Sequence, residues 1–462
     1  MADLYDIAVI GGGPAGLAAA TEAARAGVPV ILLDDQPSPG GQIYRAATHA
    51  GEDARTIMGQ EYLRGRQLLA EAEKAGVAIS TRSAVWWVEA DGTVAYSRDG
   101  ASRSLRAARL IVAAGSMERP APVPGWTLPG VMTVGGAQSL LKTGGLAARG
   151  AIFAGTGPLL YLAAAQYLRA GFPPRAVLDA TPRSNCAAAL RLLPRALRNA
   201  PLLALGLGLM KELRRAGVPV IRDVRSLAIL GASSAEAVRY ERSGRRHEAQ
   251  ATHVFLHLGV VPNLALSLAL GCDHHWHDGQ RCWHAVTDEW GRSSLTNVFL
   301  AGDGAAIGGA VAAEGQGRLA AWEALRDLGR LTRAGRDGLA VPVRRAIARE
   351  AAARPFLDRL FLPPPAWLSP ADPETIVCRC EAVTAGEIRR AVGQTATGLD
   401  GLKTFTRCGM GPCQGRLCAL TAAEILARDG TRPLSTIAPF RARFPLKPVT
   451  LADMASLHEG PL

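Results

Sequence analysis

The fold of the N-terminal part of this chain is decided by the stretch Ile7-Ala8-Val9-Ile10-Gly11-Gly12-Gly13-Pro14-Ala15-Gly16. Its four apolar residues predict a buried strand, and its glycines fit the pattern G-x-G-x-x-G between a strand and a helix. The alanine-rich residues 15–26 predict that helix, and the apolar residues 28–33 predict a second strand. This order of elements indicates a dinucleotide-binding βαβ unit.

The residues of the turn indicate how it would hold a nucleotide. Gly11 permits the tight turn, Gly13 lets the backbone approach a pyrophosphate, and Gly16 allows close packing of the helix on the strand. Pro14 and Ala15 open the helix, whose free N–H groups favour an anion. We therefore expect these five residues to bind the cofactor.

An acidic residue about twenty positions after the turn should bind the adenosine ribose. Asp35 lies nineteen residues after Gly16, and Asp34 is its rival. The strand before them is wholly apolar, so no alternation of polar and apolar residues separates the two. Both are retained as candidates for the ribose-binding acid.

A similar unit begins near residue 149. An apolar strand leads into Gly155 and Gly157, a helix follows, and a second strand ends in Asp179. Leu160 replaces the third glycine, so the pattern is incomplete. The two units together predict an α/β protein with two doubly wound dinucleotide-binding domains.

Length and composition limit the class of protein. At 462 residues the chain exceeds the roughly 250–300 residues at which a single core stops growing, so two or three domains are expected. The net charge of +12 comes mainly from arginines spread along the chain, without a basic cluster interleaved with aromatic residues, which argues against nucleic-acid binding. No apolar stretch reaches the ~18–20 residues of a membrane span, and no signal peptide is visible. We therefore expect a cytoplasmic protein, and leave open peripheral contact with the inner face of the cytoplasmic membrane.

Residues 187–215 have an unusual composition. Leucine, alanine and arginine dominate the stretch, and residues 201–210 are almost wholly apolar. Ten residues are too few to cross a bilayer. A buried helical hairpin is the favoured interpretation, and a docking surface for a partner or a membrane is the alternative.

Five of the eight cysteines lie between residues 378 and 418. They form the pattern C-x-C…C-x4-C-x4-C on glycine-rich turns, which allows them to converge on one centre. Soft thiolate ligands suit zinc or an iron–sulfur cluster, and four of them satisfy a [2Fe–2S] centre. Clustered thiols in a chain without an export signal favour metal binding over disulfides. We predict a [2Fe–2S] cluster, and structural zinc is the alternative.

Further motifs resemble the flavoproteins with two dinucleotide-binding domains, the group that contains thioredoxin reductase and glutathione reductase. The motifs are a strand that ends in Ala114-Gly115, a strand that ends in Gly302-Asp303, a helix that opens with Ala312 and Ala313, and a turn at Gly41-Gln42. The resemblance covers about residues 4–325 and implies FAD bound by a discontinuous domain. It implies that the aspartate binds the ribityl chain and that the helix start faces the isoalloxazine ring.

The chain departs from the disulfide reductases of this group in one respect. Cys186, Cys272 and Cys282 are isolated, and no C-x-x-C or C-x4-C pair occurs before residue 378. Thiol–disulfide exchange at the flavin is therefore not expected, and the three cysteines are interpreted as buried small hydrophobes. In most relatives the second domain binds NAD(P)H; here its occupant, NAD or ATP, is left open.

The cysteine segment resembles the bacterioferritin-associated-ferredoxin type of [2Fe–2S] domain, in which small helices hold a C-x-C and a later cysteine pair. Cys378 and Cys380 match the C-x-C. The spacing permits either Cys408 with Cys413 or Cys413 with Cys418 as the pair. That family has a Gly-x-Gly turn before the pair, as a Gly-Met-Gly turn precedes Cys413 here, so Cys413 and Cys418 are chosen and Cys408 is left as a spare thiol.

Nearly the whole chain resembles a narrower family, the larger subunits of opine oxidase, D-hydroxyproline dehydrogenase and cyanide-forming glycine dehydrogenase. The string 34–45, which contains Gln36 and Arg45 as expected cofactor-binding residues, and the segment 443–450 carry this resemblance. It implies the electron-transfer subunit of a dye-linked, oxygen-independent dehydrogenase that oxidises an amino acid or secondary amine such as an opine, hydroxyproline or glycine. The implied partners are a smaller amino-acid-oxidase-like subunit with its own FAD, a small ferredoxin-like subunit, and a quinone or cytochrome as acceptor. FMN at a subunit interface is also left open.

We therefore predict two α/β dinucleotide-binding domains and a small helical [2Fe–2S] domain. The expected segments are an FAD-binding domain at 1–147 with its return at 285–330, a second dinucleotide-binding domain at 148–284, a helical segment and linker at 331–375, the cluster domain at 376–425 and an extended tail at 426–462. No catalytic side chain is expected, because the catalytic groups would be cofactors. An NAD(P)H-dependent FAD and iron–sulfur reductase and a cofactor-bearing scaffold remain alternative functions.

Overall fold

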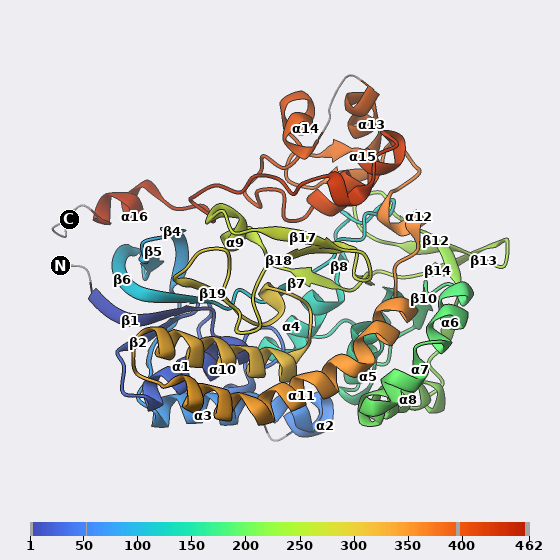
Figure 1. Cartoon of the computed structure of the whole chain (residues 1–462). Coiled ribbons are helices and arrows are strands. Elements are labelled where there is room, and N and C mark those ends of the chain that lie inside the picture. The colour runs from blue at the N-terminus through green and yellow to red at the C-terminus, as the bar shows by residue number, and fades with distance from the viewer. Residues whose placement is uncertain (1–2, 52, 394–397, 458–462) are drawn as a thin grey trace.

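The computed structural model describes residues 3–51, 53–393 and 398–457, which form two parallel sheets with helices and a smaller helical domain above them (Figure 1). Five strands of the first sheet run parallel to one another: β1 (Asp3–Ile10), β2 (Val30–Leu33), β3 (Ala78–Ser80), β6 (Ala101–Val112) and β19 (Val298–Leu300). β4 (Ala84–Val88) and β5 (Thr93–Arg98) extend it in antiparallel fashion. Because β19 pairs with β6 almost two hundred residues later, this domain is discontinuous, and the predicted fold class is confirmed.

The first sheet is covered by different elements on its two faces. α1 (Pro14–Arg25), α3 (Arg64–Lys74) and α10 (Ala310–Asp327) pack on one face, where their apolar residues join alternate residues of β1 in one core. The other residues of β1 face β4, β5 and α9 (Ala265–Ala269). Both faces of the parallel strands are therefore buried, which explains their continuous apolar runs.

The second sheet is parallel throughout, in the order β11 (Val220–Arg222), β10 (Ala176–Asp179), β9 (Ile152–Gly155), β15 (Val254–His257) and β8 (Val131–Thr133). α4 (Val134–Gly144), α5 (Pro158–Arg169) and α8 (Ala200–Arg215) join its core on one face. The antiparallel sheet of β12 (Val224–Leu230), β13 (Ala237–Arg242) and β14 (Arg245–Gln250) joins the core on the other face. β8 and α4 precede the expected boundary at residue 148, since β8 pairs with β15 rather than with the first sheet.

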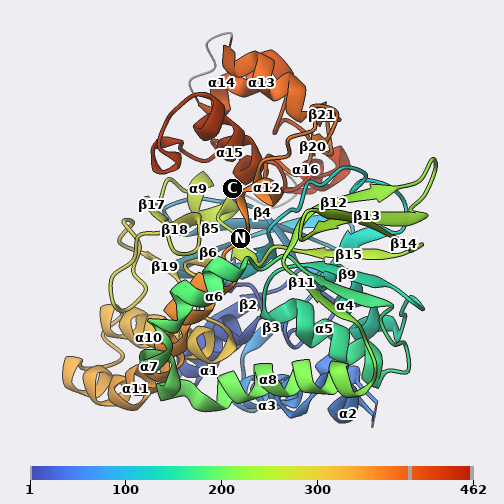
Figure 2. The same cartoon turned by 90° about the vertical axis from the view of Figure 1, so that its right-hand side faces the viewer.

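The C-terminal part begins with the long helix α11 (Arg333–Leu360) and the short α12 (Pro365–Leu368). Three helices, α13 (Ala385–Gly393), α14 (Leu399–Thr406) and α15 (Ala419–Asp429), and the small pair β20 (Ile376–Cys378) and β21 (Val383–Thr384) form the domain at the top of Figures 1 and 2. The tail then returns along the first domain to α16 (Leu451–Ser456), where the Ser102 N–H donates to Ser456 Oγ at 2.8 Å. Residues 458–462 of the expected tail lie outside the described residues.

The expectation of a buried helical hairpin at 187–215 is wrong. The segment forms α6 (Arg183–Leu190), α7 (Leu193–Ala196) and α8, and of α8 only Leu209 and Leu213 are buried. α8 packs a narrow face on α5, with Met210 partly buried against the same core, and leaves Leu205 and Leu207 exposed. Within the described residues, no helix has both the length and the apolar character needed to span a bilayer.

The prediction for the isolated cysteines is partly wrong. Cys272 and Cys282 are buried, as expected of small hydrophobes. Cys186 is exposed on α6, because the face of that helix that carries it is not covered.

Candidate functional site

The glycine turn after β1 is shaped by close backbone approaches. Gly11 has φ +107°, and a Cβ atom there would lie 2.3 Å from the Ala113 carbonyl oxygen. A Cβ on Gly16 would lie 1.8 Å from the Gly11 carbonyl oxygen. Only glycine permits these approaches, which place the start of α1 against the ends of β1 and β6.

Gly13 has a different role from these two glycines. It is the N-cap of α1, it is extended, no side chain caps the helix, and Pro14 follows at its first position. A Cβ on Gly13 would meet only Gly41 Cα, at 3.7 Å, so the chain's own packing does not demand glycine there. Glycine at this point instead leaves an open approach to the N–H groups of the helix start, which suits a phosphate.

Asp34 and Asp35, which the sequence did not separate, have different surroundings. Asp34 is buried, and its carboxylate accepts from the Gly12 N–H at 2.6 Å and the Gln36 N–H at 2.7 Å. Burial raises the pKa of Asp34, and these two N–H groups oppose the rise. Asp35 faces the tail, where Lys447 Nζ lies 2.6 Å away; burial tends to raise the pKa of Asp35, but the ammonium group lowers it. Of the two acids, Asp34 is thus the one that contacts the glycine turn.

The Gly41-Gln42 turn lies directly over the glycine turn. The Gly40 N–H donates to the Gly12 carbonyl at 2.7 Å, and a Cβ on Gly41 would lie 2.9 Å from Gly13 Cα. Arg45 Nη1 donates to Gln36 Oε1 at 2.9 Å, whereas the buried Arg45 Nε has no partner among the described residues. The two turns form a cradle of small residues with an unused cationic donor beside it.

The ends of β6 and β19 complete this site. A Cβ on Gly302 would lie 2.9 Å from Ala15 Cβ and 3.3 Å from Ala313 Cβ, so Gly302 lies between the starts of α1 and α10. Asp303 Oδ1 accepts from the N–H groups of Gly308 and Gly309 at 2.8 and 2.9 Å, which fixes the loop before α10. The buried Ala312 also lies on the first turn of α10, and Ala114 and Gly115 follow β6 beside Gly304.

These residues fit an FAD molecule. The starts of two long helices without side-chain caps converge on one place, and small residues line the cradle between them. The buried Asp34 carboxylate and the unpartnered Arg45 Nε add groups that suit a ribose and a phosphate.

Lys142, which no sequence pattern identified, links the second domain to this site. Lys142 projects from α4, and its Nζ donates to the Gln42 carbonyl at 3.0 Å, the Ile43 carbonyl at 2.9 Å and Gln138 Oε1 at 3.0 Å. Burial lowers the pKa of Lys142 to about 7, and the nearby Arg45 acts in the same direction. A lone lysine in an amphipathic helix carried no signal of this contact.

The lowered pKa predicts a specific pH dependence of stability. Below about pH 7 Lys142 is charged in both the native and the unfolded state. Above about pH 7 the native state loses the proton while the unfolded state keeps it, so the free energy of unfolding increases as the pH rises. Relative to Lys142→Met, the free energy of unfolding should rise by up to roughly 1.4 kcal/mol per pH unit between about pH 7 and about pH 9. Thermal unfolding midpoints of both proteins across this range measure the difference. Parallel midpoints would show that Lys142 keeps an ordinary pKa.

The turn of the second domain is occupied by the chain's own side chains. A Cβ on Gly155 would lie 1.8 Å from the His257 carbonyl oxygen, and one on Gly157 would lie 2.8 Å from His257 Nε2. His257 is buried, and its Nδ1 lies 2.6 Å from Glu118 Oε1. The imidazole therefore stands where a nucleotide would approach Gly157.

The acid of the second domain is also engaged within the chain. Asp179 is buried, and its carboxylate accepts from the Tyr161 hydroxyl at 2.6 Å and the Thr181 N–H at 2.9 Å. Burial and the neighbouring Asp179 charge raise the pKa of Tyr161, so the tyrosine stays a donor. Each carboxylate oxygen of Asp179 therefore has a partner within the chain.

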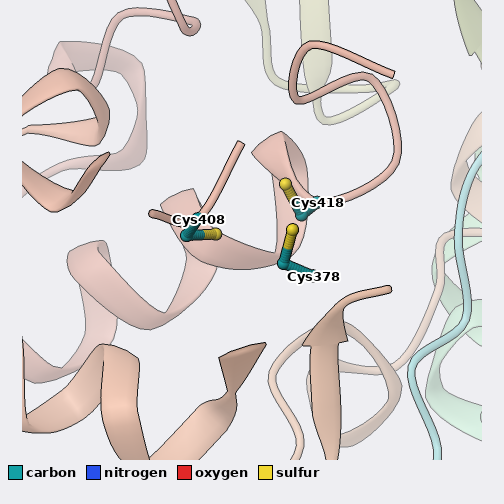
Figure 3. A group of neighbouring side chains, drawn as sticks. All are labelled: Cys378, Cys408 and Cys418. Atoms are coloured by element: carbon teal, nitrogen blue, oxygen red, sulfur yellow. The ribbon is translucent and has the colours of Figure 1, made fainter. Parts of the chain in front are cut away.

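The cysteines of the C-terminal domain come together as the spacing predicts. The Sγ atoms of Cys378, Cys408 and Cys418 lie within 4.8 Å of one another, and all three residues are buried (Figure 3). Cys378 ends β20, Cys408 follows α14, and Cys418 is the N-cap of α15. Hydrogen bonds from the thiols of Cys408 and Cys418 lower the pKa of Cys378 to about 2, so one thiolate is stabilised at this point.

Cys380 and Cys413 form the outer part of the same centre. Cys380 is exposed and Cys413 is half-buried, and their thiols interact with each other. A Cβ on Gly411 would lie 2.2 Å from Cys380 Cβ, so the glycine turn passes directly over Cys380. Three buried thiols, with the thiols of Cys380 and Cys413 beside them, fit an iron–sulfur cluster or zinc. Cys408 is buried like Cys378 and Cys418, and it lies deeper than Cys380 and Cys413, so its role as the spare thiol stays a prediction.

An apolar pocket lies where the cysteine domain meets the rest of the chain. It measures about 780 Å³, is open to solvent, and is lined by apolar side chains that include Leu264, Trp283 and Phe440. One wall is β16 (Val260–Pro262), which pairs with β7 (Ser116–Glu118) directly after Gly115. The other wall contains residues 414–416, next to Cys413.

An ion pair ties the cysteine domain to the body beside this pocket. Arg281 Nη2 lies 2.7 Å from both carboxylate oxygens of Glu424, which projects from α15. The Trp126 indole N–H donates to the Ile376 carbonyl at 2.6 Å. These contacts hold the cysteine domain in a defined position relative to the flavin-type domain.

Comparisons with known proteins agree with this geometry. Residues 5–317 match the family described as pyridine nucleotide-disulphide oxidoreductase, and residues 373–458 match the sarcosine oxidase A3 domain. The chain is 43% identical to the A-type subunit of opine oxidase from Agrobacterium tumefaciens (strain Ach5), over 99% of this chain and 92% of that one. It is 34% identical to hydrogen cyanide synthase subunit HcnB of Pseudomonas aeruginosa, over 97% and 98% of the two chains.

A solved structure supports the fold. The crystal structure of L-proline dehydrogenase from P. horikoshii superposes with a TM-score of 0.69 at 19% identity, over 98% of this chain and 79% of that one. The resemblance found in the sequence is confirmed by these matches. The chain therefore belongs to the pyridine nucleotide-disulphide oxidoreductase family and, within it, to the oxidoreductase subunits that include the A-type subunit of opine oxidase.

Proposed function

We propose that this chain is the electron-transfer subunit of a heteromeric, oxygen-independent dehydrogenase that oxidises an amino acid or secondary amine. The observation that carries the proposal is that one chain combines a flavin-type nucleotide turn with a cluster of buried thiols, with an apolar pocket where the cysteine domain meets the rest of the chain. When bound, the flavin would exchange electrons in pairs and the cluster one at a time, which would let the protein change between the two modes.

The chain's own residues would bind and position these groups. The starts of α1 and α10, with Gly13, Gly41 and Asp34, would hold the pyrophosphate and ribose of FAD. Cys378, Cys380, Cys413 and Cys418 would hold the [2Fe–2S] cluster as its four thiolate ligands. The apolar pocket walls would limit water where the cysteine domain meets the rest of the chain, and the Arg281–Glu424 ion pair would hold the separation of the two sites constant.

The names of the relatives support a multisubunit enzyme, because each is called a subunit. We propose that the partner that meets the substrate is a smaller protein of the amino-acid-oxidase type, that a small ferredoxin-like protein is a further partner, and that a quinone or cytochrome is the acceptor. FMN at the interface with the partner is part of this proposal. We place the complex on the cytoplasmic side, where a reducing environment keeps the thiols available for iron.

The behaviour toward NADH separates this proposal from an NADH-dependent reductase. His257 at Gly157 and the Tyr161–Asp179 pair occupy the second nucleotide turn, so we expect no bleaching of the flavin when micromolar NADH is added to the purified complex without oxygen. An added amine or amino-acid substrate should bleach it. Visible absorbance measures both. Prompt bleaching by NADH would overturn the proposal in favour of the reductase.

A further inference from the structure

A surface that the proposed function does not use lies on α6, α7 and α8. Four leucines protrude from it, with exposed fractions of 62% for Leu190, 57% for Leu197, 51% for Leu205 and 65% for Leu207. A globular protein rarely leaves several large apolar side chains this exposed in one segment unless something covers them. We call the segment 190–215 the leucine–arginine surface.

Basic residues flank these leucines. Arg191, Arg195, Arg198, Lys211, Arg214 and Arg215 are all exposed, and none of them takes part in a salt bridge among the described residues. Glu212 is the acidic residue of the segment, and Arg169 neutralises it through contacts of 2.6 and 2.7 Å. The surface therefore combines exposed leucines with six unpaired positive charges.

The arrangement of α8 separates its apolar and basic parts. Leu205 lies on the same face of α8 as the buried Leu209 and Leu213 but is exposed nearer the start of the helix. Leu207 and Lys211, also four residues apart, share the outward face. The outward-facing side chains of α8 are thus apolar toward its N-terminus and basic toward its C-terminus. This surface lies at the lower end of the molecule, opposite the cysteine domain (Figures 1 and 2).

We propose that the leucine–arginine surface docks on an anionic phospholipid bilayer. Leucines would enter the interfacial region, while the arginines and the lysine would contact lipid phosphates; an amphipathic basic helix binds membrane surfaces in this way. A protein partner fits less well, because the centres of protein–protein interfaces are depleted in charged residues, and here six charged side chains lie in the same segment as the exposed leucines. The proposal does not depend on which substrate the complex oxidises.

Flotation of the purified holoprotein with lipid vesicles tests this proposal. The wild type should float with vesicles of phosphatidylglycerol and phosphatidylcholine, fail to float with phosphatidylcholine alone, and be released by salt of about 1 M. Leu205→Ser/Leu207→Ser and Arg195→Glu/Arg198→Glu should each weaken binding roughly tenfold or more. Visible spectra and melting temperatures of these variants should match the wild type, because the four side chains are exposed.

Matched controls use residues of the same kind elsewhere. Arg245→Glu/Arg246→Glu on β14 makes the same change of charge at exposed positions, and Leu451→Ser removes an exposed leucine of the tail. Both should bind vesicles as the wild type does. The proposal is overturned if the wild type ignores anionic vesicles or if all variants bind equally. It is also overturned if the surface variants keep vesicle binding but lose a co-purifying subunit, since the surface would then be a protein interface.

Discussion

Replacement of Cys378 by serine should remove the iron and sulfide from the purified protein. Cys378 has the thiol whose pKa is lowered most, it is fully buried, and it lies beside both Cys408 and Cys418, so no other thiol can take its place. Iron should fall from about two atoms per chain to nearly none. Dye reduction by the complex should fall at least about 100-fold, because the loss of a direct ligand exceeds the 10–100-fold effect of outer-sphere changes. Iron and sulfide assays and the visible spectrum measure the outcome.

The same replacement at each of the other four cysteines identifies the ligand set. We expect Cys380→Ser, Cys413→Ser and Cys418→Ser to lose the cluster and Cys408→Ser to keep it. If Cys408→Ser loses the cluster and Cys418→Ser keeps it, Cys408 is a ligand in place of Cys418. Iron-free wild-type protein that contains zinc would refute the cluster, and dye reduction that survives Cys378→Ser would favour a scaffold that carries no electrons.

The ligand question shows where sequence reasoning stops. The spacing of the cysteines predicts that they converge, and the grouping of three thiols within 4.8 Å agrees with that prediction. The choice between Cys408 and Cys418 depends on how α14 and α15 pack, which no local pattern records. For the same reason Asp34 and Asp35 were indistinguishable: Asp35 is drawn away by Lys447, a residue 412 positions later.

Local signals were sufficient where a backbone conformation or a continuous apolar run decides the structure. The glycine turn after β1 and the strand at 176–179 follow from such signals, because each depends on neighbouring residues. The exposure of α8 did not follow, because an apolar helix shows its burial only when the neighbouring elements are known. Lys142 and His257 were missed since their contacts join segments far apart in the chain.

Replacement of Gly13 by valine should weaken FAD binding and leave the fold intact. Gly13 is extended, with φ −75° and ψ −174°, a conformation that valine adopts readily. An added Cβ would meet only Gly41 Cα at 3.7 Å, so the chain itself has room for it. The new methyl groups would instead block the approach to the start of α1. We expect FAD affinity to fall at least about tenfold, or about 1.4 kcal/mol, measured as flavin retained after gel filtration and by titration of the apoprotein.

Gly13→Val is expected to change FAD binding but not the stability of the fold. Its controls therefore change glycines at which an added Cβ affects only the stability of the fold. Gly338→Ala in α11 adds a Cβ with nothing within 4 Å, and it should keep the flavin and raise helix stability by up to about 1 kcal/mol. Gly16→Ala should instead destabilise the domain, because its Cβ would lie 1.8 Å from the Gly11 carbonyl oxygen. If Gly13→Val retains flavin at the wild-type level, the pyrophosphate does not approach the helix here, and the nucleotide site must lie elsewhere. If it melts as early as Gly16→Ala, the loss of flavin reflects folding alone.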